Sequence, residues 1–168
     1  SVLNITAREG DSRNGRIPNK YKIKKYFDIS QARGEISLLS SKFLTEGKLL
    51  NGSWMLSARR TYFDQFVSLY NNLNNQEDPF KYYFWDIHFK SIYKINANNK
   101  LMYSQFSGKD DLMLSFGGDD FPGIDFAWDW GNATRTLSWK YLPNSSYFVE
   151  TVLSQTNYIF DVDFSVNF

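Results

Sequence analysis

Apolar and polar side chains alternate with a period of two along much of the chain. Between Trp85 and Ile95, rings and aliphatic groups occupy one parity except at Ser91, while the other parity carries Asp86, His88 and Lys90, with Ile92 as its exception. The C-terminal stretch has an apolar side chain at every second position: Tyr158, Phe160, Val162, Phe164, Val166 and Phe168. Such alternation places successive side chains on opposite faces of a β-sheet, whereas a helix would distribute the same rings around its circumference. The pattern therefore predicts an all-β fold.

The alternating segments and the turn signals between them predict about seven strands. We expect these strands at Tyr21–Asp28, Glu35–Thr45, Ser53–Tyr62, Tyr82–Ile95, Leu101–Ser107, Trp130–Leu142 and Tyr147–Phe168. Antiparallel neighbours explain every connection, so the predicted fold is an antiparallel meander. One short helix is expected between Thr61 and Leu73, where Phe63, Phe66 and Tyr70 have helical spacing.

The predicted connections alternate between short and long. Short turns are expected at residues 96–100 and 143–146, whereas longer polar segments fall at residues 64–81 and 108–129. Short and long connections would then lie at opposite ends of the sheet, which is typical of outer-membrane barrels. A soluble sheet with uneven loops is consistent with the same lengths.

Amphipathic rings occur close to the predicted turns. Trp139 and Tyr141 precede one turn and Trp54 follows another, as in the aromatic belts that border a bilayer. Arg135 shares the parity of Trp139 and Tyr141, so it would face lipid at a cost of about 2–4 kcal/mol near the bilayer midplane. A position closer to the interface, or a bulge that shifts the parity, would relieve this cost.

Composition narrows the functional classes. The 168 residues carry 19 basic and 18 acidic side chains, and this near-neutral charge disfavours a nucleic-acid partner bound through its phosphates. The chain has no cysteine and a single histidine, which excludes thiolate chemistry and a multi-histidine metal centre within this sequence. Its 15 Phe, 11 Tyr and 5 Trp coexist with a mean hydropathy of -0.46, which suits alternating apolar and polar faces.

Five sequence blocks carry a family resemblance. In order they are SVLNITAREG at residues 1–10, GEISLLSSK at 34–42 with TEG at 45–47, GSWMLSARRTYFD at 52–64, YYFWD at 82–86 and WGNAT at 130–134. In this order and spacing the blocks resemble TonB-dependent outer-membrane receptors of the Bacteroidota type, and together they cover nearly the whole chain. Lys48 and Arg135 depart from the family pattern, which often has proline and a small or apolar residue at these positions.

The resemblance implies a fold, a domain organisation and a function. The fold would be a transmembrane β-barrel of about 22 strands with a plugged lumen, of which this chain supplies about seven. Residues 1–10 would be the C-terminal end of the plug domain, and residues 11–168 the N-terminal, incomplete portion of the barrel. The function would be uptake of a scarce large solute (a siderophore, cobalamin, peptide or glycan), without catalysis, metal or cofactor.

The same resemblance implies the surroundings of the chain. The location would be the outer membrane of a Gram-negative cell. The partners would be outer-membrane lipid, the plug domain and remaining barrel strands of the same protein, the unknown solute, and TonB through a segment outside this sequence. We further expect Phe160 and Phe164 to face lipid, and Asp161 and Asp163 to face the wet interior.

Candidate binding residues follow from the predicted strands and loops. Four polar side chains are candidates to face the barrel interior: Arg59, Asp86, His88 and Lys90. For Arg59, pairing with a nearby carboxylate is favoured over contact with the plug or a solute. For Asp86, His88 and Lys90, plug contact or plain solvation is favoured over solute contact. Three rings in the long connections are candidates for stacking on the solute: Tyr70, Phe116 and Phe121. The aspartates and glycines of residues 108–129 could chelate Ca²⁺, but a solvated extracellular loop is favoured because their spacing is not that of an EF-hand.

Two other functional classes remain open at this stage. The chain could form a small complete eight-stranded outer-membrane barrel that acts as an adhesin or structural protein. Alternatively, it could form a soluble β-sandwich that binds glycans through exposed Trp and Tyr rings. The first would show heat-modifiable mobility when refolded alone, and the second would be soluble without detergent.

Overall fold

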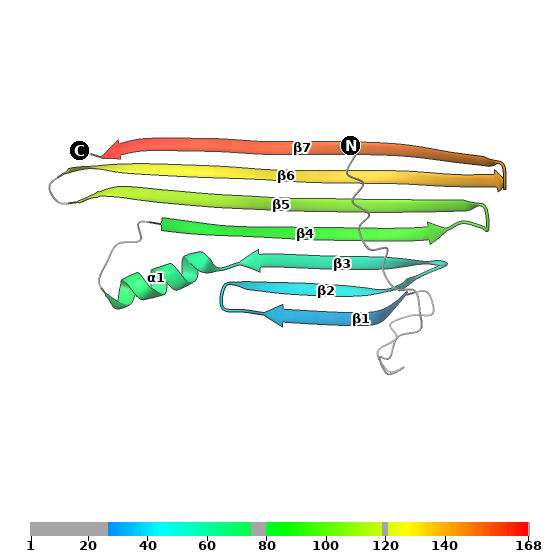
Figure 1. Cartoon of the computed structure of the whole chain (residues 1–168), viewed down its shortest axis with the longest axis horizontal. Coiled ribbons are helices and arrows are strands. Elements are labelled where there is room, and N and C mark those ends of the chain that lie inside the picture. The colour runs from blue at the N-terminus through cyan, green and yellow to red at the C-terminus, as the bar shows by residue number, and fades with distance from the viewer. Residues whose placement is uncertain (1–26, 75–79, 119–120, 168) are drawn as a thin grey trace.

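The computed structural model describes residues 27–74, 80–118 and 121–167. Seven strands form one antiparallel sheet, in which each strand pairs with its neighbours in sequence (Figure 1). The strands are β1 (Phe27–Ile36), β2 (Ser40–Leu49), β3 (Gly52–Thr61), β4 (Phe80–Lys94), β5 (Asn99–Gly118), β6 (Phe121–Asn144) and β7 (Tyr147–Asn167). The strand order β1 to β7 confirms the predicted all-β meander, with one helix, α1 (Phe63–Leu73), between β3 and β4.

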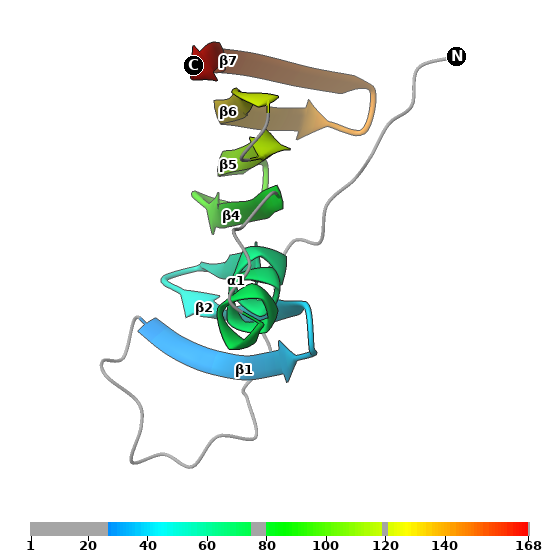
Figure 2. The ribbon, with the colours of Figure 1, turned by 90° about the vertical axis from the view of Figure 1, so that its left-hand side faces the viewer.

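The sheet is a single layer. Figure 2, seen from the end that carries α1, shows the strands following one another in one twisted sheet. The buried apolar core is correspondingly small, because among the described residues only Trp54, Met55 and Ile92 are buried hydrophobic side chains. Large apolar side chains of β7 are open to solvent, and Phe164 is 65% exposed. Most of the apolar surface therefore has no protein cover within the described part of the chain.

The two ends of the sheet differ in the elements that they carry. The β2–β3, β4–β5 and β6–β7 hairpins lie at one end, called here the turn end and drawn on the right in Figure 1. The opposite end, called the helix end, carries α1, the β1–β2 hairpin and the adjoining termini of β5 and β6. The strands β4 to β7 are longer than β1 to β3 and extend past them at the helix end (Figure 1).

The predicted long loop at residues 108–129 is wrong. β5 continues to Gly118, and β6 already begins at Phe121. Leu112 pairs with Trp128 on one face, where Leu112, Leu114 and Phe116 continue along β5, and on β6 Asp125 and Asp129 alternate with rings. Composition suggested a loop because aspartate and glycine are abundant here, whereas the period of two, which these residues keep, determines the structure.

The first hairpin also differs from the prediction of a strand at Glu35–Thr45. β1 ends at Ile36 and β2 begins at Ser40, because the Ser37 hydroxyl bonds across the turn to the Ser40 backbone. Such side-chain-to-backbone bonds stabilise a turn. The turn residues Leu38 and Leu39 are exposed. Because both are apolar, the sequence did not indicate a turn at this position. Of the other N-terminal strand predicted, Tyr21–Asp28, only residues 27 and 28 lie among the described residues, at the start of β1.

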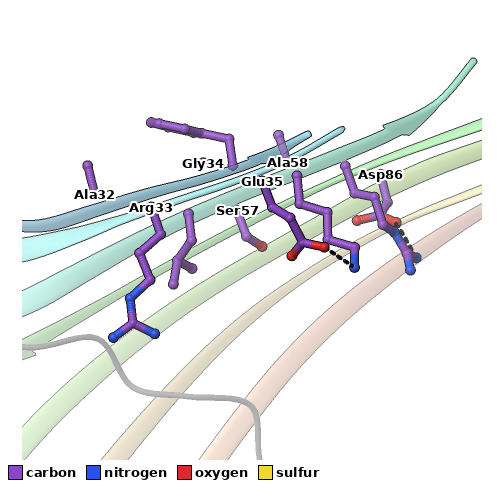
Figure 3. Close-up of a pocket in the computed structure, with 11 residues that line it drawn as sticks. Ala32, Arg33, Gly34, Glu35, Ser57, Ala58 and Asp86 are labelled. Carbon is purple, nitrogen blue, oxygen red and sulfur yellow. Dashed lines mark hydrogen bonds and ion pairs between the residues drawn. The ribbon is translucent and has the colours of Figure 1, made fainter. Parts of the chain in front are cut away.

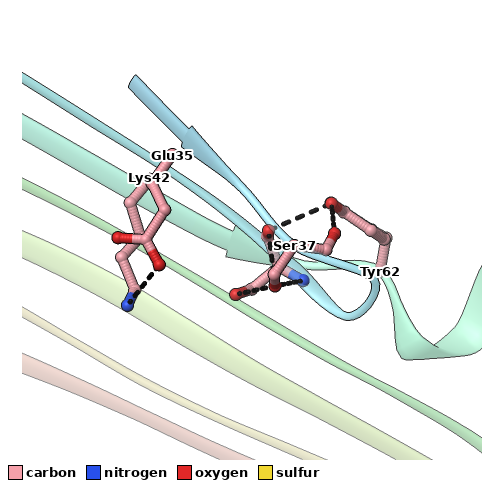
Figure 4. A network of polar contacts seen from close by, with 5 residues as sticks. Glu35, Ser37, Lys42 and Tyr62 are labelled. Atoms are coloured by element: carbon pink, nitrogen blue, oxygen red, sulfur yellow. Dashed lines mark hydrogen bonds and ion pairs between the residues drawn. The ribbon is translucent and has the colours of Figure 1, made fainter. Parts of the chain in front are cut away.

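Tyr62 fastens this hairpin to the end of β3. Its hydroxyl donates to the carbonyl oxygens of Ser37 and Ser40, the latter at 3.0 Å (Figure 4). The backbone N–H of Tyr62 also donates to the carbonyl oxygen of Leu39, at 3.0 Å. The side chain and backbone of one residue therefore connect the β1–β2 hairpin to the end of β3.

We expect Tyr62→Phe to lower the free energy of unfolding by about 1 kcal/mol, because it removes a hydroxyl that bonds both the Ser37 and the Ser40 carbonyl. Urea unfolding of the full-length protein in detergent, followed by tryptophan fluorescence, measures the change. Ser145→Ala, in the exposed β6–β7 turn, is the control and should be neutral. Equal stability of Tyr62→Phe and the parent would mean that the two hydrogen bonds do not hold the hairpin.

The predicted helix is confirmed as α1. Phe63 packs edge-on against Phe80 of β4, with ring centroids 5.9 Å apart, and Asp64 lies in the first turn, where a negative charge favours the helix dipole. At the other end, the Asn74 amide donates to the carbonyl oxygen of Tyr70 at 2.7 Å. Within residues 27–74, 80–118 and 121–167, no helix has the length and apolarity needed to cross a membrane.

The pairing register assigns every strand residue to one of two faces, because directly paired residues lie on the same face. Arg59 pairs with Asp86 and Asp86 with Gly108, so these residues define the Asp86 face. Trp85 and Ile87 alternate with Asp86 along β4 and define the opposite, Trp85 face. All four residues predicted to face a barrel interior lie on the Asp86 face: Arg59, Asp86, His88 and Lys90.

The apolar surface changes face along β4 to β7. In the half of these strands toward the turn end, apolar side chains lie on the Trp85 face: Ile87, Phe89, Tyr93, Leu101, Tyr103, Leu137, Trp139, Tyr141, Val149 and Leu153. In the half toward the helix end they lie on the Asp86 face: Phe80, Phe84, Leu112, Leu114, Phe126, Trp128, Trp130, Phe160, Val162 and Phe164. The crossing row contains Asp86, Gly108, Asn132 and Tyr158.

The pairing register relates the faces of β7 to those of β4. Phe160 pairs with Trp130, which pairs with Asp110 on the Asp86 face, so Phe160 shares the face of the candidate interior residues. Asp161 and Asp163 lie on the Trp85 face instead. The alternation within β7 is as predicted, but lipid for Phe160 and a wet interior for Asp86 cannot both hold if each face has one environment throughout, because the two residues share a face. Period two within a strand does not connect its faces to those of the next strand.

Candidate functional site

A hollow opens on the Asp86 face where the apolar surface changes side. It has a volume of about 360 Å³ and lies over β3 to β7. Rings and glycines make most of its lining, together with a few polar groups: Arg59, Tyr82, Phe84, Trp85, Asp86, Phe106, Gly108, Asp110, Trp130, Gly131, Asn132 and Tyr158. We call it the aromatic hollow. Its size lies within the range of roughly 300–1,000 Å³ found for small-molecule sites.

Gly108 leaves the space on which the aromatic hollow depends. A Cβ atom at this position would lie 3.2 Å from Cζ of Phe106 and 3.4 Å from Cβ of Asp86. The Phe106 ring therefore lies close over the glycine and takes up part of the space that a larger residue would need. On either side, Gly108 pairs with Asp86 of β4 and Asn132 of β6, so two polar groups flank the gap.

An ion pair forms the β3 side of the aromatic hollow. Nη2 of Arg59 lies 2.5 Å from Oδ2 of Asp86, and Nε donates to the same oxygen at 2.7 Å. The guanidinium carbon also lies 4.7 Å from the centroid of the Phe84 ring, within cation–π range. Asp86 is mostly covered, with 17% of its side chain exposed, whereas Arg59 is 46% exposed. The guanidinium thus keeps donors free to reach a bound molecule.

Rings form the helix-end wall of the aromatic hollow. Trp130 lies 5.2 Å from Trp128 between ring centroids, and Tyr158 stacks on Phe160 at 6.4 Å with planes 13° apart. Phe84 adds a third ring on β4. These contacts hold the rings in position, and they leave Tyr158 65% exposed. The wall therefore offers ring faces to a ligand without rearrangement of the backbone.

Asp110 supplies a carboxylate between two of these rings. It pairs with Phe84 on one side and Trp130 on the other. The hydroxyl of Tyr82 donates to its Oδ1 at 3.0 Å. Burial, and secondarily this bond to Asp110, raises the pKa of Tyr82 above its ordinary value, so the phenol stays protonated and keeps donating at neutral pH. The second oxygen of Asp110 remains an acceptor for a ligand.

A second, charged hollow adjoins the first on β1 to β3. It has a volume of about 840 Å³ and shares Arg59 and Asp86 with the aromatic hollow. Figure 3 shows Arg33, Glu35 and Ser57 pointing to one side of the sheet, with Ala32 and Ala58 on the other. The ion pairs Glu35–Lys42 at 3.7 Å and Arg59–Asp86 cross it (Figure 3). The Arg59–Asp86 pair therefore separates a charged hollow from an aromatic one.

The structure brings together some of the predicted site residues and separates others. Arg59 and Asp86 line both hollows. His88 and Lys90 continue the same face toward the turn end, where Nε2 of His88 lies 3.1 Å from Oγ of Ser104 and Lys90 is buried. These two residues do not line either hollow.

The three predicted stacking rings do not converge on one site. Tyr70 lies on α1 and is 65% exposed, while Phe116 lies near the end of β5 and is 61% exposed. Phe116 is therefore a strand residue on the Asp86 face, not a loop residue, because β5 extends through the predicted loop. Phe121 is the first residue of β6, and its side chain lies outside the described residues.

Sequence reasoning missed the residues that form the wall of the aromatic hollow: Phe84, Asp110, Trp130 and Tyr158. Asp110 was assigned to a loop, and Tyr158 was assigned to the lipid side of its strand. The sequence did contain one indication of this wall. Apolar residues occupy every second position at Leu112, Leu114 and Phe116, so the strand pattern continues past Gly108. It would have extended β5 and placed Asp110 beside Trp130.

Aspartates form a row on the Trp85 face at the helix end, behind the aromatic wall. Asp111 pairs with Asp129, and Asp129 with Asp161. Nζ of Lys109 lies 3.0 Å from Asp129 and 3.4 Å from Asp111, and its hydrogen bond lowers the pKa of Asp129. Among the described residues, no group of three or more acidic or histidine side chains has the arrangement of a metal site.

The lowered pKa of Asp129 predicts a loss of stability in acid. Because the folded-state pKa lies below the unfolded one, this carboxylate stabilises the fold above the unfolded value of about 3.9, and the contribution disappears as the pH falls toward the folded value. We expect the parent to exceed Asp129→Asn by roughly 0.2–1 kcal/mol at pH 7, as for an exposed ion pair, and by less at pH 3. Urea unfolding at both pH values measures this difference, and a difference that grows in acid would contradict the assignment.

Comparison with known proteins gave no relationship: no family model, no curated protein and no solved structure matches the chain.

Proposed function

We propose that this chain forms part of the barrel wall of a TonB-dependent outer-membrane transporter, which binds and imports a scarce large solute. The Trp85 face would contact lipid in the turn-end half of β4 to β7. The Asp86 face would line the wet interior beside the plug. The proposed role is capture and passage of the solute, so no covalent step and no catalytic residue are assigned.

The proposal rests on the difference between the two faces of the sheet in the turn-end half. Its Trp85 face bears large exposed apolar side chains, among them Ile87 at 44%, Leu137 at 40% and Leu153 at 66% exposed. Such a surface is uncommon on a soluble monomer unless it binds another apolar phase. A bilayer on this face accounts for the exposure without a second protein layer.

The opposite face of the same half carries a row of small hydroxyl side chains on β6 and β7, beside the apolar Ile92, Met102 and Val152. Thr134 lies 3.1 Å from Thr156, and Thr136 lies 3.1 Å from Ser154, between hydroxyl oxygens. His88 and Ser104 continue this face on β4 and β5. Apolar side chains outside and polar side chains inside are the arrangement of a transmembrane barrel with a hydrated lumen.

The apolar band has dimensions that suit a bilayer. On β7 its apolar side chains are Val149, Leu153 and Ile159, with the polar Thr151, Gln155 and Asn157 between them on the same face. About ten residues at about 3.3 Å each and a tilt near 40° span roughly 25 Å, the height of the apolar band of outer-membrane barrels. At the turn end, Trp139 and Tyr141 stack at 5.7 Å with planes 9° apart, and the indole N–H of Trp139 donates to the Asn99 side chain at 3.0 Å. A ring with a polar tip suits the interface.

The helix-end half would then project beyond the bilayer. Its Trp85 face carries the aspartate row, which suits water, and its Asp86 face carries the aromatic wall. The aromatic hollow would open toward the interior near the outer boundary of the bilayer, where an arriving solute is first held. A soluble β-sandwich receives less support, because a sandwich needs two packed sheets and all described strands belong to one.

The test is the location of the full-length protein. Cells that express the complete gene are fractionated, and the protein should be recovered in the outer membrane with heat-modifiable gel mobility. Uptake of its solute should stop when TonB is deleted, while binding to the cell surface remains. Recovery from the soluble periplasm would reject the proposal.

A further inference from the structure

We propose that the aromatic hollow binds a pyranose ring of a neutral glycan. This inference rests on the proposed function, because it names the class of solute that the interior-facing site would take. Three features carry it: ring faces, mixed donors and acceptors, and the position of Arg59. Each is a property of the described residues.

The ring faces suit the flat apolar side of a sugar. Trp130, Tyr158 and Phe84 line the aromatic hollow, and the Phe106 ring lies close to Gly108 on β5 between them. Aromatic rings combine a large apolar area with a rigid shape, so they hold a flat ligand with little loss of side-chain freedom. A pyranose presents several C–H groups on one side and can lie against such a ring.

The polar groups around the hollow match hydroxyl groups. A hydroxyl both donates and accepts hydrogen bonds, and so do the groups present here. Asp110 and Asp86 accept, Arg59 donates, and the Asn132 amide does both. Small-molecule sites combine apolar walls with a few such placed polar groups. A ligand that only donates, or only accepts, hydrogen bonds would bond to fewer of these groups.

The position of Arg59 disfavours cationic ligands. Its guanidinium already lies 4.7 Å from the Phe84 ring centroid, so a cation bound there would meet a like charge. Anionic metal chelates are disfavoured too, because the lining carries one basic side chain, Arg59, against the two acidic side chains of Asp86 and Asp110. A neutral ligand avoids both penalties.

The adjoining charged hollow gives the rest of the glycan a path. It is larger, about 840 Å³ against about 360 Å³, and reaches from the Arg59–Asp86 pair to Arg33 on β1. Its charged side chains Glu35 and Lys42 pair with one another and can also bond hydroxyl groups. One sugar would stack in the aromatic hollow, while the next units lie over charged side chains and the apolar Leu44 between them.

The test uses the full-length protein in detergent, with isothermal titration of four neutral oligosaccharides: maltohexaose, cellohexaose, mannohexaose and xylohexaose. A hexapeptide of alanine and a ferric catecholate complex serve as the other solute classes. We expect saturable binding of at least one oligosaccharide. Trp130→Ala and Asp110→Asn should weaken it by about tenfold, whereas Trp130→Phe, which keeps a ring, should retain most of it. Trp139→Ala, a tryptophan of the same strand on the other face, is the matched control and should bind like the parent.

Absence of binding by all four oligosaccharides would overturn the inference, as would equal affinity in the parent and Trp130→Ala. Binding of the peptide or the ferric complex that Trp130→Ala weakens would replace the glycan by that class. The two proposals fail separately. A protein located in the outer membrane that binds no sugar leaves the proposed function standing, whereas a soluble protein rejects that function whether or not it binds sugar. Heat-modifiable mobility of each variant confirms its fold.

Discussion

Adding a single methyl group at Gly47 or Gly52 should prevent the N-terminal half of the sheet from forming. A Cβ atom at Gly47 would overlap the backbone carbonyl oxygen of Asp28, and one at Gly52 would overlap that of Ile92. Both neighbours are backbone atoms in paired strands, so they cannot turn away as a flexible side chain does. We expect Gly47→Ala and Gly52→Ala to lower the free energy of unfolding by about 3 kcal/mol or more.

The loss of stability in these two variants is large because the clashes lie beside buried residues. Gly47 pairs with Trp54, whose indole N–H donates to the same Asp28 carbonyl at 3.2 Å and whose ring stacks on Phe27 at 5.0 Å. Displacing Asp28 would therefore also break the contact of β1 with one of the few buried rings. Gly52 faces β4 beside Ile92, another of the buried residues.

Gly34 provides the matched control. It also lies in a strand, β1, but a Cβ atom there would meet nothing within 4 Å. Gly34→Ala should be neutral or slightly stabilising, because alanine restricts the unfolded chain. Urea unfolding of the three variants in the full-length protein measures the contrast. Similar stability of Gly47→Ala and Gly34→Ala would show that β1 does not pack against β2 as described.

Replacing the charge of Arg135 should stabilise the protein in a bilayer. Arg135 lies on the Trp85 face, and Gln105 and Gln155 pair with it on either side. It is about six residues from Tyr141, or roughly 15 Å from the turn-end interface along the normal, which is near the midplane of the proposed span. Arg135→Leu should therefore raise the free energy of unfolding in lipid vesicles by about 2–4 kcal/mol.

Thr136 is the control for this prediction, because it is the next residue on β6 and points to the opposite face. Thr136→Leu loses the hydroxyl contact with Ser154 and places an apolar side chain in the proposed wet interior. It should be neutral or destabilising by about 1 kcal/mol. If Arg135→Leu instead destabilises the protein in vesicles, another protein surface or water, and not lipid, covers this part of the Trp85 face.

The repeated alternation was enough to predict the sheet and its strand order. Each strand carries its own period of two, and the short hairpins at the turn end contain recognisable turn residues such as Asn98 and Asn144. The helix α1 was also predictable, because its rings have helical spacing. The turn at residues 37–39 was not, because its apolar tip looks like a continuing strand and the stabilising hydroxyl of Tyr62 comes from a residue distant in sequence.

The candidate site was predictable only in part. Arg59 and Asp86 were named, and an ion pair was the favoured explanation of Arg59. Their shared face depends only on the β3–β4 register, whereas the aromatic wall depends on the registers of β4 to β7 together. A shift of one residue in any pair would move Trp130 or Tyr158 to the other face. Hydrophobic pattern alone does not fix such a register when the apolar surface changes face within the strand.

The most direct test of the account is the environment of the two faces in the turn-end half. Because the chain has no cysteine, single nitroxide labels can be placed through Leu137→Cys and Leu153→Cys on the Trp85 face, and Thr136→Cys and Ser154→Cys on the Asp86 face. In the full-length protein in vesicles, the account predicts that labels at 137 and 153 collide with oxygen dissolved in the acyl chains, while labels at 136 and 154 collide with a water-soluble nickel chelate. Nickel accessibility at all four positions, or lipid exposure at 136 and 154, would contradict it.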